Sequence, residues 1–150
     1  MEKEKNIIND KLVFEGEYLN RKRNGKRKEY YDDGKLKFEE EYLNGEINGK
    51  VKEYYDDGEI EFEGEYLNGK KWNGKGFNKN NEIEYEIKVG NGKVKEYYDD
   101  GEIEFEGEYL NGERNGKGKE YYSNGNLKFE GEYLNGERNG KGKEYNLFNN

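Results

Sequence analysis

Apolar and charged residues alternate along much of this chain. In LKFEGEY (127–133) and EIEFEGEY (102–109), aliphatic, aromatic or glycine residues take every second position, and the positions between them are charged. A period of two is typical of a β-strand with one buried face. No stretch of ten or more residues shows a helical period. The pattern therefore predicts an all-β chain.

The strand pattern recurs at a nearly constant interval. Its central aromatic residues are separated by 24, 24, 23, 20 and 24 positions, and KVKEYYDDGEIEFEGEYLNG occurs unchanged at 50–69 and 93–112. A period in this range indicates a repeat architecture. We expect a polar leader at 1–11 and one domain of six units at 12–150, irregular at 70–93. The six aromatic residues are Phe14, Phe38, Phe62, Tyr85, Phe105 and Phe129.

Turn dipeptides set the expected register of the strands. Asp-Gly or Asn-Gly occurs at 33–34, 57–58, 100–101 and 124–125, which predicts type I′ hairpin turns. This places Glu120 opposite Phe129, Gly118 opposite Gly131 and Tyr121 opposite Lys128. One face then carries alternating Lys and Glu, and the other carries aromatic residues with glycines that leave room for the rings. We expect a twisted meander of about 12 strands, on the order of 55–60 Å across.

Composition excludes several classes of function. The 150 residues are 29% hydrophobic and 41% charged, with no Pro, Cys or His, and no apolar run has the length of a membrane span or signal peptide. Without His or Cys we expect no enzyme, and the Asp pairs fit turns rather than a metal site, so no cofactor or metal is predicted. A net charge of −8 opposes direct binding of nucleic acid or membrane lipid. A cytoplasmic protein is expected.

The repeat unit resembles a known family. FEGEYLNGERNGKGKEYYSNG (105–125) and its copies are similar to MORN repeats (membrane occupation and recognition nexus), most of all to the bacterial antitoxin-like variant. The resemblance implies an elongated, single-layered sheet of β-hairpins with an aromatic groove. Tyr stands where the family often has Trp. Glycine positions of the unit are occupied by Glu40 and Ile87 in the first strand and by Arg27, Val51 and Val94 in the second.

Function then depends on surfaces. The register sets a row of glutamates beside the phenylalanines, a surface that suits a basic or amphipathic segment of a partner protein. We expect an interaction module or scaffold. The alternative is an acidic inhibitor, antitoxin-like or directed at a nucleic-acid-binding effector, that blocks the partner's basic surface. On this face the candidate contact residues are Glu53, Glu96, Glu120, Phe62, Phe105, Tyr66 and Tyr109.

The irregular stretch 70–93 supplies the remaining candidates. It gains a residue at KKWNG, loses an Asp-Gly turn and shortens a loop, and it holds the chain's single Trp. Loops often carry function and Trp often anchors interfaces, so Lys70, Lys71, Trp72 and Phe77 are predicted partner contacts. In the alternative, Trp72 fills a bend left by the missing turn.

The two ends of the predicted sheet are unpaired. They lie near Leu12–Tyr18 and near Lys141–Tyr145. Because exposed edges invite pairing, homodimerisation through an edge strand or through the aromatic groove is left open.

Overall fold

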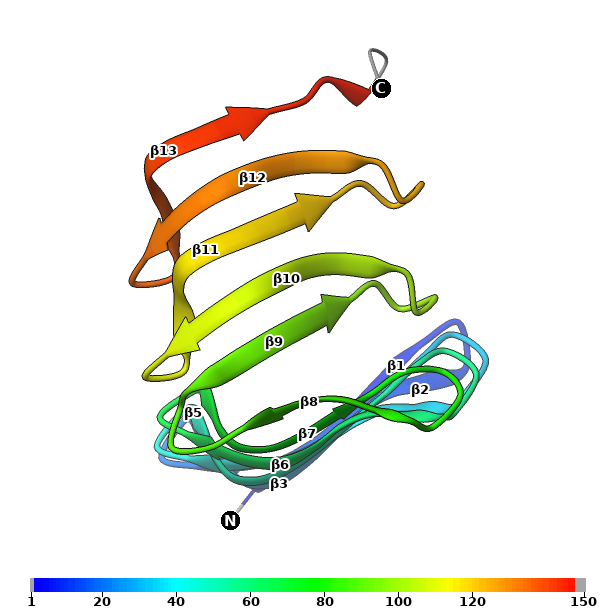
Figure 1. Cartoon of the computed structure of the whole chain (residues 1–150). Helices are drawn as coiled ribbons and strands as arrows, with labels where there is room; N and C mark the ends of the chain where they lie inside the picture. The colour runs from blue at the N-terminus through cyan, green and yellow to red at the C-terminus, as the bar shows by residue number, and fades with distance from the viewer. Residues whose placement is uncertain (1, 148–150) are drawn as a thin grey trace.

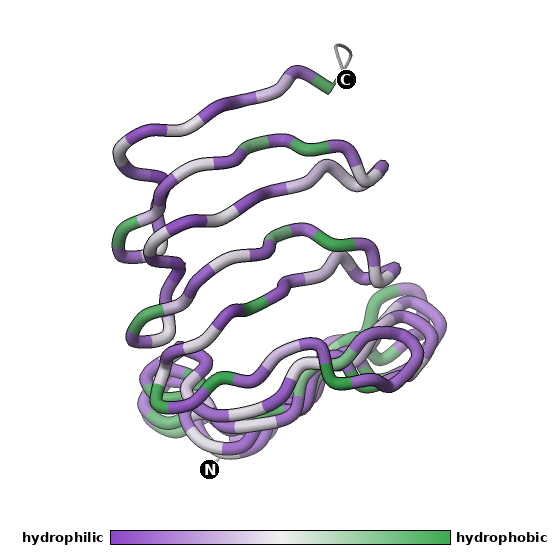
Figure 2. Tube along the Cα trace, in the orientation of Figure 1, coloured by the Kyte–Doolittle hydropathy of each residue, from purple (hydrophilic) through white to green (hydrophobic). Residues whose placement is uncertain are grey.

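The computed structural model describes residues 2–147, which form thirteen β-strands and no α-helix (Figure 1). The all-β prediction is confirmed. Short hydrophobic stretches are separated by hydrophilic ones along the strands (Figure 2). The strands are β1 (Glu2–Ile8), β2 (Lys11–Leu19), β3 (Lys22–Tyr30), β4 (Leu36–Leu43), β5 (Glu46–Tyr54), β6 (Ile60–Leu67), β7 (Lys70–Phe77), β8 (Ile83–Ile87), β9 (Gly92–Tyr97), β10 (Ile103–Leu110), β11 (Glu113–Tyr121), β12 (Leu127–Leu134) and β13 (Glu137–Glu144).

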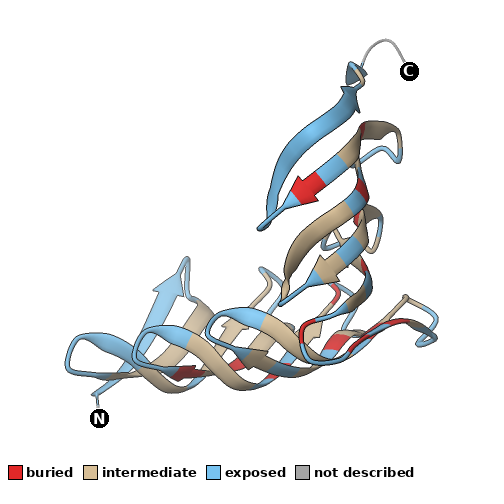
Figure 3. Cartoon of the chain, turned by 60° about the vertical axis from the view of Figure 1, so that its left-hand side comes forward, coloured by how far each residue is buried: buried red, intermediate tan, exposed pale blue. Residues whose placement is uncertain are grey.

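Consecutive strands pair antiparallel, so the chain is a meander, but the meander is divided. Strands β1 to β8 form one sheet in chain order, and β9 to β13 form a second. Each sheet is a single layer, and the second rises steeply from the end of the first (Figure 3). The expected single continuous sheet is therefore folded into two arms.

The first residues extend the sheet. Residues 2–8, expected to be a polar leader, form β1 and pair with β2, with Glu2 opposite Tyr18 and Lys5 opposite Glu15. Residue 1 and the end of the expected domain, residues 148–150, lie outside the described residues. The prediction of an exposed edge at Leu12–Tyr18 is wrong, because β1 covers β2 and becomes the outer strand. This strand also explains why there are thirteen strands rather than about 12.

The turn types differ from the prediction. In the turn from Tyr122 to Gly125, the Gly125 N–H donates to the Tyr122 carbonyl at 2.9 Å, and Gly125 has φ 89° while Asn124 does not have a positive φ. This is a type I turn closed by a glycine bulge. The bulge takes up one residue, so Tyr121 pairs with Leu127 and not with Lys128. Type I′ turns occur instead in the other loop of each unit, where residues 135 and 136 have φ of 51° and 87°.

The central register and the role of the glycines are confirmed. Glu120 pairs with Phe129, Lys119 with Glu130, and Gly118 with Gly131. A β-carbon on Gly118 would lie 2.7 Å from Cε2 of Phe105. The phenylalanine ring therefore lies flat on backbone that only glycine leaves bare.

The fold between the two sheets occurs where glycines are replaced. Ile87 on β8 and Val94 on β9 occupy positions that are glycine in the regular unit, and each is 1% exposed. Side chains at these positions do not divide a sheet by themselves, because Arg27, Glu40 and Val51 occupy them on strands that stay paired. A single bridge between Lys88 and Asn91 links the two strands. Beyond this bridge the strands diverge, and the side chains fill the inner corner.

The corner is the main hydrophobic core. Ile87 and Val94 pack with Phe62 and Tyr85, and partly buried tyrosines from both sheets surround them. These tyrosines are Tyr66, Tyr97 and Tyr109. A second, smaller cluster contains Phe105, Phe129 and Tyr133. Figure 3 shows buried segments in both sheets and near the corner, while the outermost strands at both ends are exposed.

Backbone contacts hold the corner at its two sides. On one side, the Gly90 N–H donates to the Trp72 carbonyl and the Gly112 N–H donates to the Gly90 carbonyl, both at 2.8 Å. On the other side, the Asp56 N–H donates to the Asp99 carbonyl at 3.1 Å. The first two bonds connect β7 with the turn between β10 and β11 through Gly90, and the third joins turns of the two sheets, so backbone as well as the core holds the angle between the arms.

Candidate functional site

The predicted row of glutamates is present on the aromatic face. Glu53, Glu96 and Glu120 lie opposite Phe62, Phe105 and Phe129 across the strand pairs. Each carboxylate accepts a hydrogen bond from the hydroxyl of a tyrosine 13 residues further along the chain. The bonds are Tyr66 to Glu53 at 2.6 Å, Tyr109 to Glu96 at 2.7 Å and Tyr133 to Glu120 at 2.6 Å.

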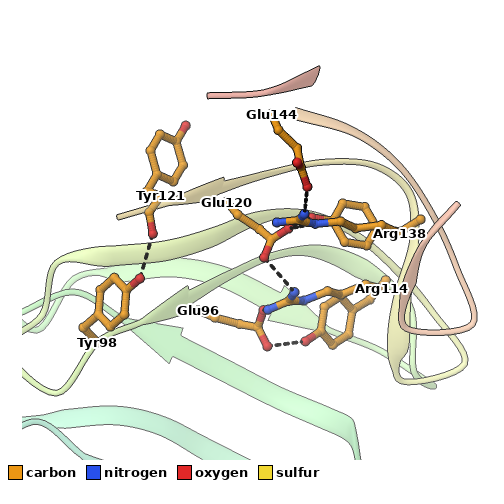
Figure 4. A network of polar contacts seen from close by, with 9 residues as sticks. Glu96, Tyr98, Arg114, Glu120, Tyr121, Arg138 and Glu144 are labelled. Carbon is orange, nitrogen blue, oxygen red and sulfur yellow. Dashed lines mark hydrogen bonds and ion pairs between the residues drawn. The ribbon is translucent and has the colours of Figure 1, made fainter. Parts of the chain in front are cut away.

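Cations from the same chain also occupy this row. Arg114 donates two hydrogen bonds to Glu96, at 2.9 and 2.6 Å, and Arg138 bridges Glu120 and Glu144 (Figure 4). Burial acts to raise the pKa of Glu120, but the hydrogen bonds from Arg138 and Tyr133 outweigh it and lower that pKa. The carboxylates therefore have internal partners.

The same cations cover the phenylalanine rings. The guanidinium carbon of Arg114 lies 4.0 Å from the centroid of Phe105, and that of Arg138 lies 4.1 Å from the centroid of Phe129. Lys71 takes this place in the central unit, 4.5 Å from the centroid of Phe62. Stacking of a cation on a ring is favourable. The aromatic face is thus closed and largely neutralised by the chain itself, and it is not an open acidic trough.

Lys71 belongs to the core. Its ammonium forms an ion pair with Glu53 at 3.4 Å and lies 3.4 Å from the Tyr85 hydroxyl. Although burial acts to lower the pKa of Lys71, the attraction of Glu53 and of the nearby phenol oxygens raises it well above its ordinary value. The structure therefore joins Lys71 to the candidates Glu53, Phe62 and Tyr66 in one internal network, with Tyr109 beside it.

The other three residues of the irregular stretch are separated. Lys70 forms an ion pair with Glu113 at 2.7 Å across the turns of the two sheets. Trp72 is half-buried, and a β-carbon on Gly90 would lie 2.8 Å from its Cζ3 atom, so the ring lies against the corner turn. Phe77, at the opposite end of β7, accepts a hydrogen bond from the Tyr55 hydroxyl at its carbonyl. These contacts agree with the alternative in which Trp72 fills a bend.

A groove lies on the opposite, Lys/Glu face of the second sheet. Its volume is about 840 Å³, its floor is glycine backbone, and its walls are side chains of alternating charge. We call it the glycine-floored groove. It is lined by Glu84, Lys93, Val94, Lys95, Glu106, Gly107, Glu108, Lys117, Gly118, Lys119, Glu130, Gly131, Glu132, Lys141, Gly142 and Lys143.

Sequence reasoning missed this groove, although it located the two faces. The signal is the tripeptide Lys-Gly-Lys opposite Glu-Gly-Glu, as in Lys117–Lys119 opposite Glu130–Glu132. The interpretation of the glycines from the sequence concerns only the rings on the aromatic side. On the Lys/Glu face the floor is the backbone between successive charged side chains, because a side chain at a glycine position would point to the aromatic face.

Residues 2–147 contain neither a cluster of metal-ligating side chains nor a membrane-spanning helix. Within this range no group of three or more Asp or Glu side chains could hold a metal ion. No helix in the described part of the chain is long and apolar enough to cross a membrane.

Known sequence families match most of the repeats. The MORN repeat profile matches residues 105–127 and 129–145, and the MORN repeat variant profile matches 23–44, 47–68 and 90–111. Residues 69–89, which hold Trp72 and the end of the first sheet, lie outside all five stretches. No curated protein matches the chain. Neither description mentions an antitoxin, so the likeness to that variant stays a prediction. The repeats, their register and these matches show that the chain belongs to the MORN-repeat family.

Proposed function

We propose that this protein is a scaffold that binds an amphipathic segment of a partner protein in the glycine-floored groove. MORN repeats are non-enzymatic modules that commonly mediate protein interactions. The observation that carries the proposal is the groove itself, which is an open channel across the second sheet with a bare backbone floor. A groove whose floor is backbone and whose walls are the side chains of Lys and Glu, with apolar stems and charged ends, suits a segment with one apolar and one charged side.

The charges of the groove favour a partner segment with both signs of charge. Lysines and glutamates alternate along the walls, in six and five positions respectively. A strongly basic segment would meet more lysines than glutamates there. On the aromatic face, Glu53, Glu96 and Glu120 already have cationic partners. Of the two kinds of segment expected from the sequence, basic or amphipathic, we therefore favour the amphipathic one.

The inhibitor alternative has less support than the scaffold. It depends on an open acidic surface that could cover a cationic site. The internal ion pairs of the glutamate row reduce that surface, and the net charge of −8 is spread over both arms. We therefore retain the scaffold as the proposal.

Lysine labelling tests the proposal. A partner is captured from lysate of the source cells, and lysine acylation is compared with and without it. We expect the partner to slow labelling of Lys117, Lys119, Lys141 and Lys143. Lys26 and Lys50 occupy the position of Lys117 in units of the first sheet and are likewise exposed, so they are matched controls. Equal protection of both sets, or protection of the control pair alone, would overturn the groove as the binding site.

A further inference from the structure

The outer edge of β13 is free. Within residues 2–147 no strand pairs with this edge, and all eight residues of β13 are exposed. Figure 3 shows this outermost strand in the colour of exposed residues. We infer that the edge binds an extended segment of a partner polypeptide with the pattern Phe-Glu-Gly-Glu-Tyr. The proposed surface is the backbone edge of β13, whose side chains Lys141 and Lys143 also line the end of the glycine-floored groove, and the inference does not depend on the proposed function.

The chain contains a second strand with the same sequence as β13, and the strand paired with its outer edge shows which sequence this edge can bind. NGERNGKGKEY occurs at 111–121, covering β11, and again without change at 135–145, covering β13. The outer edge of β11 is paired with β12, whose sequence is LKFEGEYL. Identical strands present the same row of backbone donors and acceptors. β13 thus repeats an edge whose occupant is visible one unit earlier.

On the Lys/Glu face, the charges of β13 determine which residues an incoming strand can carry. Lys117 pairs with Glu132 and Lys119 with Glu130 across β11 and β12. The equivalent residues on β13 are Lys141 and Lys143. Each opposite-charge pair across strands is stabilising, and like charges directly opposite are destabilising. The incoming strand must therefore carry two acidic residues two positions apart, and a glycine between them would repeat the pairing of Gly131 with Gly118.

On the aromatic face, the same comparison of β11 with β13 predicts a tyrosine and a phenylalanine in the incoming strand. Tyr133 of β12 donates its hydroxyl to Glu120 at 2.6 Å, and the guanidinium carbon of Arg114 lies 5.8 Å from the Tyr133 ring. The equivalents on β13 are Glu144, which is 74% exposed, and Arg138. On an incoming strand, a tyrosine hydroxyl can donate a hydrogen bond to Glu144, and the tyrosine ring can lie near Arg138. A phenylalanine would lie opposite Glu144, as Phe129 lies opposite Glu120.

A second molecule of this protein offers β1 as its other outer strand, and β1 does not meet these requirements. On β1, Lys3 and Lys5 lie on the Lys/Glu face, opposite Glu17 and Glu15 of β2. In the register that β12 uses, they would face Lys141 and Lys143. β1 also has no aromatic residue and no glycine. The charge pattern therefore favours a strand of another polypeptide.

The probe is a capped peptide, LKFEGEYL, which has the sequence of β12. Its control, LKFKGKYL, differs only in the two charges. We expect calorimetry to show that the protein binds the first roughly tenfold more tightly, because two attractive pairs become two repulsive ones. The double variant Lys141→Glu and Lys143→Glu should reverse the preference. The double variant Lys3→Glu and Lys5→Glu has the same net charge and should keep it.

Hydrogen exchange locates the bound peptide. We expect LKFEGEYL to slow amide exchange in β13 and to leave β1 unchanged. Binding of the two peptides with equal affinity, absence of binding by LKFEGEYL, or protection outside β13 would each overturn the inference. The comparison of the two peptides on the unaltered protein stands even if the β13 variant folds poorly.

Discussion

Arg27 and Glu40 face each other at a pair of positions that are both glycine in the regular repeat. They are register partners on β3 and β4, and a guanidinium nitrogen lies 3.1 Å from the carboxylate. Their side chains are 13% and 6% exposed. Two departures from the repeat pattern that look independent in the sequence are thus one buried ion pair.

This pair predicts a non-additive response to mutation. Arg27→Gly leaves the Glu40 carboxylate buried without its cation, and we expect a loss of about 3–5 kcal/mol in the free energy of unfolding. Adding Glu40→Gly restores the glycine pair of the other units and should recover most of the loss. Urea denaturation of the two single variants and the double variant measures the coupling. A double variant as unstable as Arg27→Gly would contradict the pairing.

Glu61 predicts a pH dependence at the corner. Burial, with the nearby Glu53 carboxylate second, raises its pKa from 4.5 to about 8. The folded state then holds this proton more tightly than the unfolded chain does. Its contribution to stability is complete below about 4.5 and is lost as the pH rises through 8. We expect Glu61→Gln to flatten this slope in urea denaturation between pH 5 and 9. The exposed neighbour Glu63→Gln should retain it, and an unchanged slope in Glu61→Gln would contradict the assignment.

The Phe105 ring lies flat on Gly118, so a methyl group added at Gly118 should lower the stability of the protein. A β-carbon at Gly118 would meet Cε2 of Phe105 at 2.7 Å and Cε2 of Tyr133 at 3.0 Å. Since both rings belong to the core of the second sheet, we expect Gly118→Ala to destabilise by about 1–3 kcal/mol. Lys119→Ala, on the adjacent exposed position, should change stability by only about 0.5 kcal/mol. Thermal melting of the two variants measures this difference in stability. Equal melting temperatures would contradict the prediction and show that the Phe105 ring can move aside.

Substitution of Trp72 distinguishes a structural role in the corner from a role in partner contact. Its ring lies against Gly90 in the turn between the sheets, so we expect Trp72→Ala to lower the free energy of unfolding by about 1–3 kcal/mol. Lysine protection in the glycine-floored groove should stay unchanged. The opposite result, with unaltered stability and lost partner binding, would support the contact role that the sequence suggested.

Local patterns predicted much of the fold, and contacts distant in sequence account for what they missed. The alternation in LKFEGEY and the facing glycines 118 and 131 were enough for the strands, faces and central register. The two-armed shape was not predictable in the same way. Ile87 and Val94 meet in the corner core only in the folded chain, and each is an ordinary strand residue by itself.

The candidate site was predicted less well than the fold. The glutamate row follows from the register, but its occupation does not, because Arg114 and Arg138 reach Glu96 and Glu120 from 18 residues away. Only the folded chain shows that these arginines point onto the rings. The glycine-floored groove likewise depends on the curvature of the second sheet, which no single repeat encodes.

Photo-crosslinking from the groove tests the central claim most directly. A benzophenone amino acid replaces Lys119 in one protein and Lys52, the same repeat position on the first sheet, in another. Each is irradiated in lysate, and crosslinked peptides are identified by mass spectrometry. The account predicts that position 119 captures one amphipathic segment of a partner protein and that position 52 does not. Crosslinks of that partner to position 52 alone, or to both positions equally, would contradict it.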